Sequence, residues 1–107
     1  MQPMIRTVTK TSAEADLLTV PGARRAAMLA ANVAGIARQR ALRTSLGLGA
    51  VSEAMAAADL ALRMANEAAA TEDRSTMRAR AAEAWAAAQR AIAAERRVTL
   101  VEVAVGR

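Results

Sequence analysis

The sequence predicts a mainly α protein, built as a three-helix bundle or as a long helical hairpin plus one helix, with a short N-terminal extended arm and a C-terminal β-strand. Three observations predict this fold class. Alanine, the residue with the highest helix propensity, supplies 31 of the 107 residues. Apolar residues recur at helical spacing in three long segments, and glycine-containing or polar breaks separate these segments. The length fits a single domain over residues 1–107.

The N-terminal residues 1–22 are expected to form an arm and a short helix. The stretch MIRTVTKT at 4–11 alternates apolar and polar residues and contains β-branched ones, which predicts a short strand or an extended arm. Residues 12–20 are expected to form one or two helical turns capped by Ser12, and the VPG at 20–22 is expected to end them. A basic helix then covers residues 23–43, and its large apolar side chains on one face are Leu29, Val33 and Ile36.

Residues 50–97 predict an alanine-rich helical hairpin. Its first helix covers residues 50–70, its second covers residues 74–97, and the polar turn ATEDRS joins them. Thr71 and Asp73 are both candidate N-caps of the second helix. The expected buried stripes are Val51, Met55, Ala58, Leu62, Ala65 and Ala69 on the first helix, and Met77, Ala81, Trp85, Ala88 and Ile92 on the second.

Trp85 is the only aromatic residue of the chain. We expect it to anchor the core of a helix–helix seam, where its indole N–H needs an acceptor or solvent. The alternative is an exposed Trp85 that acts as a hot spot for a partner. The core position is favoured because no other aromatic side chain is available to fill the space between the helices.

The C-terminal segment VTLVEVAV predicts a β-strand over residues 98–105, because its valines alternate with other residues. A single strand is not stable alone, so we expect it to pair with the N-terminal arm or with the same strand of a second copy. The sparse core and the uncharged middle of the first long helix also favour a homo-oligomer. The candidate interface residues are Val101, Val103, Val105, Leu29, Val33 and Ile36.

The net charge of +5 comes from the first half of the chain. The first long helix carries no acid and five arginines near its two ends, namely Arg24, Arg25, Arg38, Arg40 and Arg43. Three interpretations stay open: solvated ends of a buried helix, binding to nucleic-acid phosphates, or docking on an acidic protein surface. Single-stranded nucleic acid is the less favoured ligand, because the chain lacks aromatic side chains on which bases stack.

The chain has no histidine and no cysteine, the commonest general base and the usual soft metal ligand. We therefore identify no catalytic, cofactor-binding or metal-ligating residue, and expect no enzyme activity, cofactor or small-molecule substrate. The GLGAVS at 47–52 predicts an interhelical turn, because it lacks the third glycine and the lysine of phosphate-binding loops. The N-terminus lacks the apolar core of a signal peptide, and the uncharged run 26–37 is too short to span a bilayer, so we expect a cytoplasmic protein.

Together these features predict a non-enzymatic, oligomeric helical assembly or adaptor protein that acts through its helix faces and terminal strands. The composition, with 14 arginines against one lysine, suggests a bacterial or phage origin, for which a virion or scaffold component fits; a phage-encoded chain would be virion-associated. The alternative is a DNA-binding or transcription-regulatory protein that uses the arginine-rich first helix and the N-terminal arm. The expected partners are a second copy and another protein, with nucleic acid as the alternative and no membrane.

Overall fold

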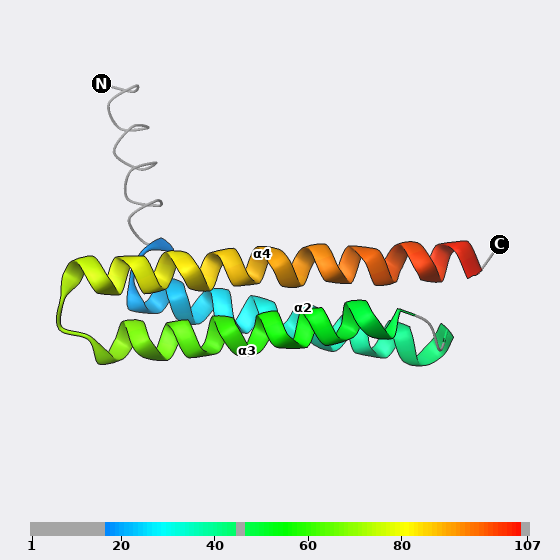
Figure 1. The fold of residues 1–107 in the computed structure, drawn as a ribbon, viewed down its shortest axis with the longest axis horizontal. Coiled ribbons are helices and arrows are strands. Elements are labelled where there is room, and N and C mark those ends of the chain that lie inside the picture. Colours follow the sequence, from blue (N-terminus) through cyan, green and yellow to red (C-terminus); the bar gives the residue numbers. More distant parts are fainter. Residues whose placement is uncertain (1–16, 45–46, 106–107) are drawn as a thin grey trace, which may run out of the picture.

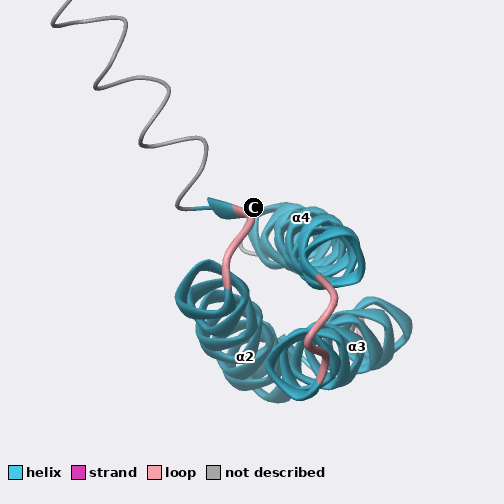
Figure 2. Cartoon of the chain, turned by 90° about the vertical axis from the view of Figure 1, so that its left-hand side faces the viewer, coloured by secondary structure: helices cyan, strands magenta, loops and turns pink. Residues whose placement is uncertain are grey.

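The computed structural model describes residues 17–44 and 47–105, and within this part of the chain it contains three long helices and no strand. These are α2 (Val20–Thr44), α3 (Leu48–Ala70) and α4 (Arg74–Val105). Figure 1 shows α3 running back along α2, and α4 running back along α3, so α2 and α4 point the same way. In the end-on view of Figure 2 the helices form a triangle in which each packs on the other two. This confirms the predicted helical bundle.

Helix α2 begins earlier than the sequence predicts. Thr19 caps it: the Thr19 Oγ1 accepts a hydrogen bond from the Gly22 N–H at 3.1 Å, and the Thr19 carbonyl accepts from the Ala23 N–H at 2.8 Å. Pro21 therefore lies in the first turn of α2. Backbone N–H groups in the first turn have no helical acceptor, so the N–H that proline lacks is not needed there. The prediction that VPG at 20–22 ends the preceding helical turns is wrong, because this segment opens α2.

The other two helix starts follow recognisable caps. Gly47 precedes α3 with a φ of 76° and ψ of 17°, a left-handed conformation that favours glycine. Asp73 precedes α4, and its carboxylate accepts hydrogen bonds from the Thr76 N–H at 3.1 Å and from the Thr76 hydroxyl at 2.5 Å. Asp73 is thus confirmed as the N-cap, whereas the Thr71 hydroxyl accepts from the Asp73 N–H inside the turn.

The predicted C-terminal strand over 98–105 is wrong, because α4 continues as a helix to Val105. Val98 lies four residues after Ala94 and is buried with it in one apolar cluster, so the helical period continues past Arg97. The Thr99 hydroxyl donates to the Glu95 carbonyl one turn earlier, at 3.2 Å. The β propensity of these residues is overridden here by helix packing, as is common for this weak preference.

The core is made of alanine. Among the described residues, all but three of the buried apolar ones are alanines, the exceptions being Val51, Met64 and Val98. Alanine side chains are small, so they allow the backbones of neighbouring helices to come close together. Of the large apolar residues that the sequence places on the buried faces, Val51 is buried in this core. Most of the others lie beside the core or outside it: Met55, Leu62, Leu29 and Ile36 are exposed, and Val33, Trp85 and Ile92 are half-buried.

The predicted arm at 4–11 and the predicted short helix capped by Ser12 lie outside the described residues, apart from the last few residues of that helix. Of those, Thr19 ends the segment as the cap of α2. The predicted helix bounds of 23–43, 50–70 and 74–97 correspond to the observed Val20–Thr44, Leu48–Ala70 and Arg74–Val105.

Candidate functional site

Several large apolar side chains are exposed on the surface of this bundle. Met28 is 66% exposed, Leu62 is 54% exposed and Met55 is 45% exposed, although each belongs to the apolar part of its helix. Fully burying such a side chain contributes about 1.5–3 kcal/mol. A single copy of the chain therefore leaves a large apolar contribution unused. The other exposed large apolar residues in the part of the chain that the structure describes are Leu17, Leu29, Ile36, Leu42, Leu48 and Leu100.

Two adjoining hollows lie on the outer side of the seam between α2 and α3. They have volumes of about 490 and 250 Å³, and both are lined by Ala31, Ala58 and Asp59. They therefore form one continuous depression, which we call the α2/α3 groove. Its other lining residues are Arg24, Ala27, Met28, Leu62, Ala65 and Asn66 in the larger hollow, and Ala34, Gly35, Arg38 and Met55 in the smaller one.

The charges of the α2/α3 groove are separated by helix. Arg24 and Arg38 belong to α2, and Asp59 belongs to α3. Although Asp59 lines both hollows, it makes no ion pair with either arginine or with any other described residue. Arg63, four residues after Asp59 in α3, makes no ion pair with a described residue either. The groove thus has basic groups on one wall and an acidic group on the other, each free of an ion-pair partner within the described part of the chain.

The ion pairs between helices all involve α4 within the described residues. Arg40 of α2 contacts Glu95 of α4 at 3.2 Å, and Arg40 also donates a hydrogen bond to Thr99. On the other side, Arg80 of α4 contacts Glu67 of α3 at 3.5 Å. Ion pairs therefore hold α4 to both of the other helices, whereas the described side chains form none between α2 and α3.

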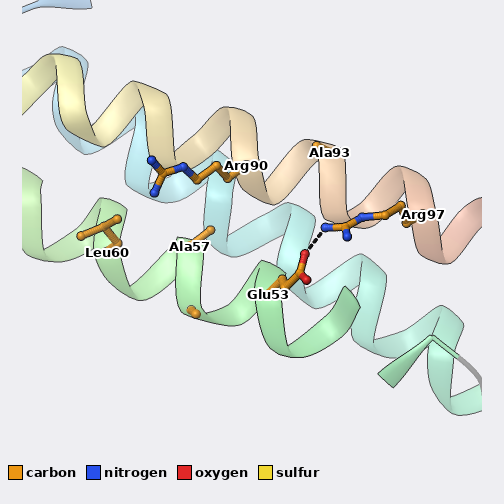
Figure 3. A pocket seen from close by; sticks show the side chains of 7 residues that line it. Glu53, Ala57, Leu60, Arg90, Ala93 and Arg97 are labelled. Atoms are coloured by element: carbon orange, nitrogen blue, oxygen red, sulfur yellow. Dashed lines mark hydrogen bonds and ion pairs between the residues drawn. The ribbon is translucent and has the colours of Figure 1, made fainter. Parts of the chain in front are cut away.

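A second groove lies between α3 and α4 (Figure 3), with a volume of about 390 Å³. The Glu53–Arg97 ion pair closes one end of it. The Arg90 guanidinium points away from Glu53 and has no ion pair with a described residue. The floor is apolar and consists of Ala56, Ala57, Leu60 and Ala93. The ion pair across this seam makes it a more closed surface than the α2/α3 groove.

The five arginines predicted as one binding element do not share one face. Arg24 and Arg38 line the α2/α3 groove, whereas Arg40 faces α4 and is engaged with Glu95. Arg25 and Arg43 are exposed. Because a helix rises 1.5 Å per residue, the pair at the start of α2 lies about 20 Å from the group near its end.

The predicted interface residues are also dispersed. Val33 packs against the core, whereas Leu29 and Ile36 stay 37% and 46% exposed. The backbone at Val101, Val103 and Val105 is helical, so these residues do not form the predicted strand. The side chains of these three valines lie outside what the structure describes.

Sequence reasoning missed the groove residues Met28 and Gly35, and it placed Met55 and Leu62 in the core. The signal that could have indicated these residues was the width of the apolar surface on each helix. On α3 the alanines Ala54, Ala57 and Ala61 repeat beside the stripe that contains Met55 and Leu62, so each helix offers two apolar faces of different size.

Trp85 lies at the edge of the core, half-buried against it. Its indole N–H donates a hydrogen bond to the Leu17 carbonyl oxygen at 2.7 Å. The Leu17 carbonyl thus supplies the acceptor that the indole N–H was expected to need. The bond also connects the segment preceding α2 to α4.

The described residues contain no group of three acids that could hold a metal ion. Among the same residues, no helix is both long enough and apolar enough to cross a membrane.

Hydrogen bonds from Thr76 lower the pKa of Asp73 below its ordinary value of 3.8, the effect expected for a carboxylate capping a helix. No known protein family, curated protein or solved structure matches this chain.

Proposed function

We propose that this chain is a non-enzymatic assembly protein that associates through the apolar faces of its helices. The observation that carries the proposal is the reversal of size between core and surface. Alanines occupy the interior, while Met28, Met55 and Leu62 stand exposed around one groove. Contiguous exposed apolar surface rimmed by polar groups is typical of protein–protein contact sites.

The α2/α3 groove is the contact surface that these residues support best. Large side chains flank a floor of small residues, Ala31, Gly35 and Ala58. A partner helix can therefore pack against the large side chains and approach the floor closely. The charged residues lie at the rim, as in most protein interfaces. The α3/α4 groove fits this role less well, because the Glu53–Arg97 pair occupies one end of it.

Sedimentation velocity of the wild-type chain and of a triple variant, Met28→Gln, Met55→Gln and Leu62→Gln, tests this proposal. All three side chains are exposed, so we expect the variant to keep its helical circular dichroism. The wild-type chain is expected to sediment as an assembly and the variant as a monomer. The control is Leu100→Gln, at a leucine of α4 that lies outside the groove and is at least as exposed as the three groove residues. It should leave the assembly intact.

Two results would contradict the proposal. One is a wild-type chain that sediments as a monomer at every concentration tested. The other is a triple variant that assembles as well as the wild-type chain, which would remove the groove from the contact surface.

Duplex DNA binding is a second candidate function, favoured by the exposed arginines of α2. Arg24, Arg25 and Arg38 are exposed and form no ion pair with a described residue. Such arginines release counterions when they meet phosphates, so binding should weaken steeply as salt is raised. Fluorescence anisotropy of a labelled duplex at low and moderate salt tests this function. Arg24→Gln with Arg38→Gln should weaken binding, and unchanged binding would exclude these residues.

A further inference from the structure

We propose that the partner on the α2/α3 groove is a second copy of this chain, related by a two-fold axis that runs along the groove. This inference rests on the proposed assembly function and names its partner. Such an axis keeps the direction of every helix and places α2 of one copy over α3 of the other. The two copies then form two stacked layers of two helices each, in which each α2 lies antiparallel to the partner's α3.

Charge complementarity supports a second copy as the occupant. The wall formed by α2 carries Arg24 and Arg38, and the wall formed by α3 carries Asp59. Rotation about an axis along the groove brings the acidic wall of each copy over the basic wall of the other. In an isologous interface every contact occurs twice, so one arrangement satisfies the charges of both copies.

The positions of the charges also disfavour a two-fold axis that crosses the groove at the level of Ala31. Ala31 lies seven residues from Arg24 and seven from Arg38, and it shares both hollows with Asp59. An axis across the groove at this level would place Arg24 over Arg38 of the copy, and Asp59 over its own equivalent. Like charges placed opposite each other in an interface are strongly unfavourable. The axis along the groove avoids both repulsions.

Arg38 is the nearer partner of Asp59 in this arrangement. Helical side chains lean toward the helix N-terminus, so the Arg38 guanidinium extends back toward the level of Ala31, whereas Arg24 extends away from it. The axial gap between Arg38 and Ala31 is about 10 Å, and an arginine and an aspartate together cover most of it. The small residues Ala31, Gly35 and Ala58 let the two layers approach closely enough for this contact.

Sedimentation equilibrium on charge variants tests the inference. Arg38→Asp and Asp59→Arg each place like charges at both symmetric contacts, so each should weaken dimerisation by about tenfold or more. The double variant, Arg38→Asp with Asp59→Arg, exchanges the two charges and should recover most of the wild-type affinity. The control is Arg96→Asp, a charge reversal of equal size at an exposed arginine outside the groove, which should change the affinity little.

The outcomes separate this inference from the proposed function. A wild-type dimer weakened by the single variants and restored by the double variant supports both. A wild-type assembly that is insensitive to Arg38→Asp and Asp59→Arg, or a double variant weaker than either single variant, overturns the inference and leaves the assembly function standing. A wild-type chain that stays monomeric throughout overturns both.

Discussion

Val98 of α4 packs against Gly47, the residue that caps α3: a β-carbon added at Gly47 would lie 3.5 Å from the Val98 Cγ2 atom. This contact joins the turn between α2 and α3 to the far end of α4. The distance is an ordinary van der Waals contact, so the space alone would accept an alanine. The backbone would not, because Gly47 has a φ of 76°.

Replacing Gly47 with alanine should therefore destabilise the chain by about 1 kcal/mol, the approximate cost of a left-handed conformation for a residue with a β-carbon. Urea denaturation at a fixed protein concentration measures this change. The control is Gly49→Ala, which is helical and has nothing within 4 Å of the added carbon, and which should stabilise the chain by about 0.5 kcal/mol. Equal effects of the two substitutions would argue against the left-handed cap.

Enlarging the alanine core should be harmful. Ala88 is fully buried, and a leucine in its place has to push the helices apart, which should cost about 1–3 kcal/mol. Ala86→Leu adds the same atoms at an exposed position on the same helix and should change the free energy of unfolding little. A stable, well-folded Ala88→Leu variant would show that the core has room for large residues and that alanines do not set the helix spacing.

The indole of Trp85 should contribute through its hydrogen bond as well as through packing. Trp85→Phe removes the donor that contacts the Leu17 carbonyl oxygen at 2.7 Å while keeping an aromatic ring. We expect a loss of about 1 kcal/mol in the free energy of unfolding, followed by circular dichroism. An unchanged free energy would mean that solvent replaces the indole as the partner of that carbonyl at no cost.

The cap at Asp73 should give the stability of the chain a pH dependence in the acid range. Its hydrogen bonds with Thr76 place the pKa in the folded chain below the ordinary value of 3.8. This stabilisation is therefore fully present above the ordinary value, and it is lost as the pH falls through the lower pKa of the folded chain.

Thermal unfolding of an Asp73→Ala variant checks this dependence. The variant should have a lower Tm than the wild-type chain at neutral pH, and the difference should narrow as Asp73 becomes protonated. Glu72→Ala removes a neighbouring exposed acid and should show no such narrowing. A gap for Asp73→Ala that is constant down to strongly acid pH would contradict the role of the carboxylate charge.

Much of the fold follows from the sequence because its determinants are local. The turns around Gly47 and Asp73 depend on residues adjacent in the chain, and alanine favours helices wherever it occurs. The C-terminal strand was predicted wrongly because the helical state of that segment depends on a distant contact, that of Val98 with α3 and with the turn before it.

The buried faces could not be predicted from periodicity alone. Pattern analysis gives most weight to large apolar residues, so it placed Met55 and Leu62 in the core. In the bundle the alanine faces turn inward. Helices that meet through alanines can approach closely and make many van der Waals contacts, which stabilise the bundle in place of contacts between large side chains. The candidate groove depends on how α2 and α3 are placed relative to each other, and no segment of the sequence specifies that placement by itself.

Cysteine cross-linking between copies tests most directly the claim that two chains pack through the α2/α3 groove. The chain has no cysteine of its own, so two single variants, Ala31→Cys and Ala58→Cys, can be prepared separately and then mixed under mild oxidation. Disulfides form only where the α-carbons come within about 7 Å. Stacking α2 on the partner's α3 predicts covalent dimers in the mixture, joined between position 31 of one chain and position 58 of the other, and few in either variant alone. Covalent dimers in each single variant but none joining the two variants, or no covalent dimer at all, would contradict the arrangement.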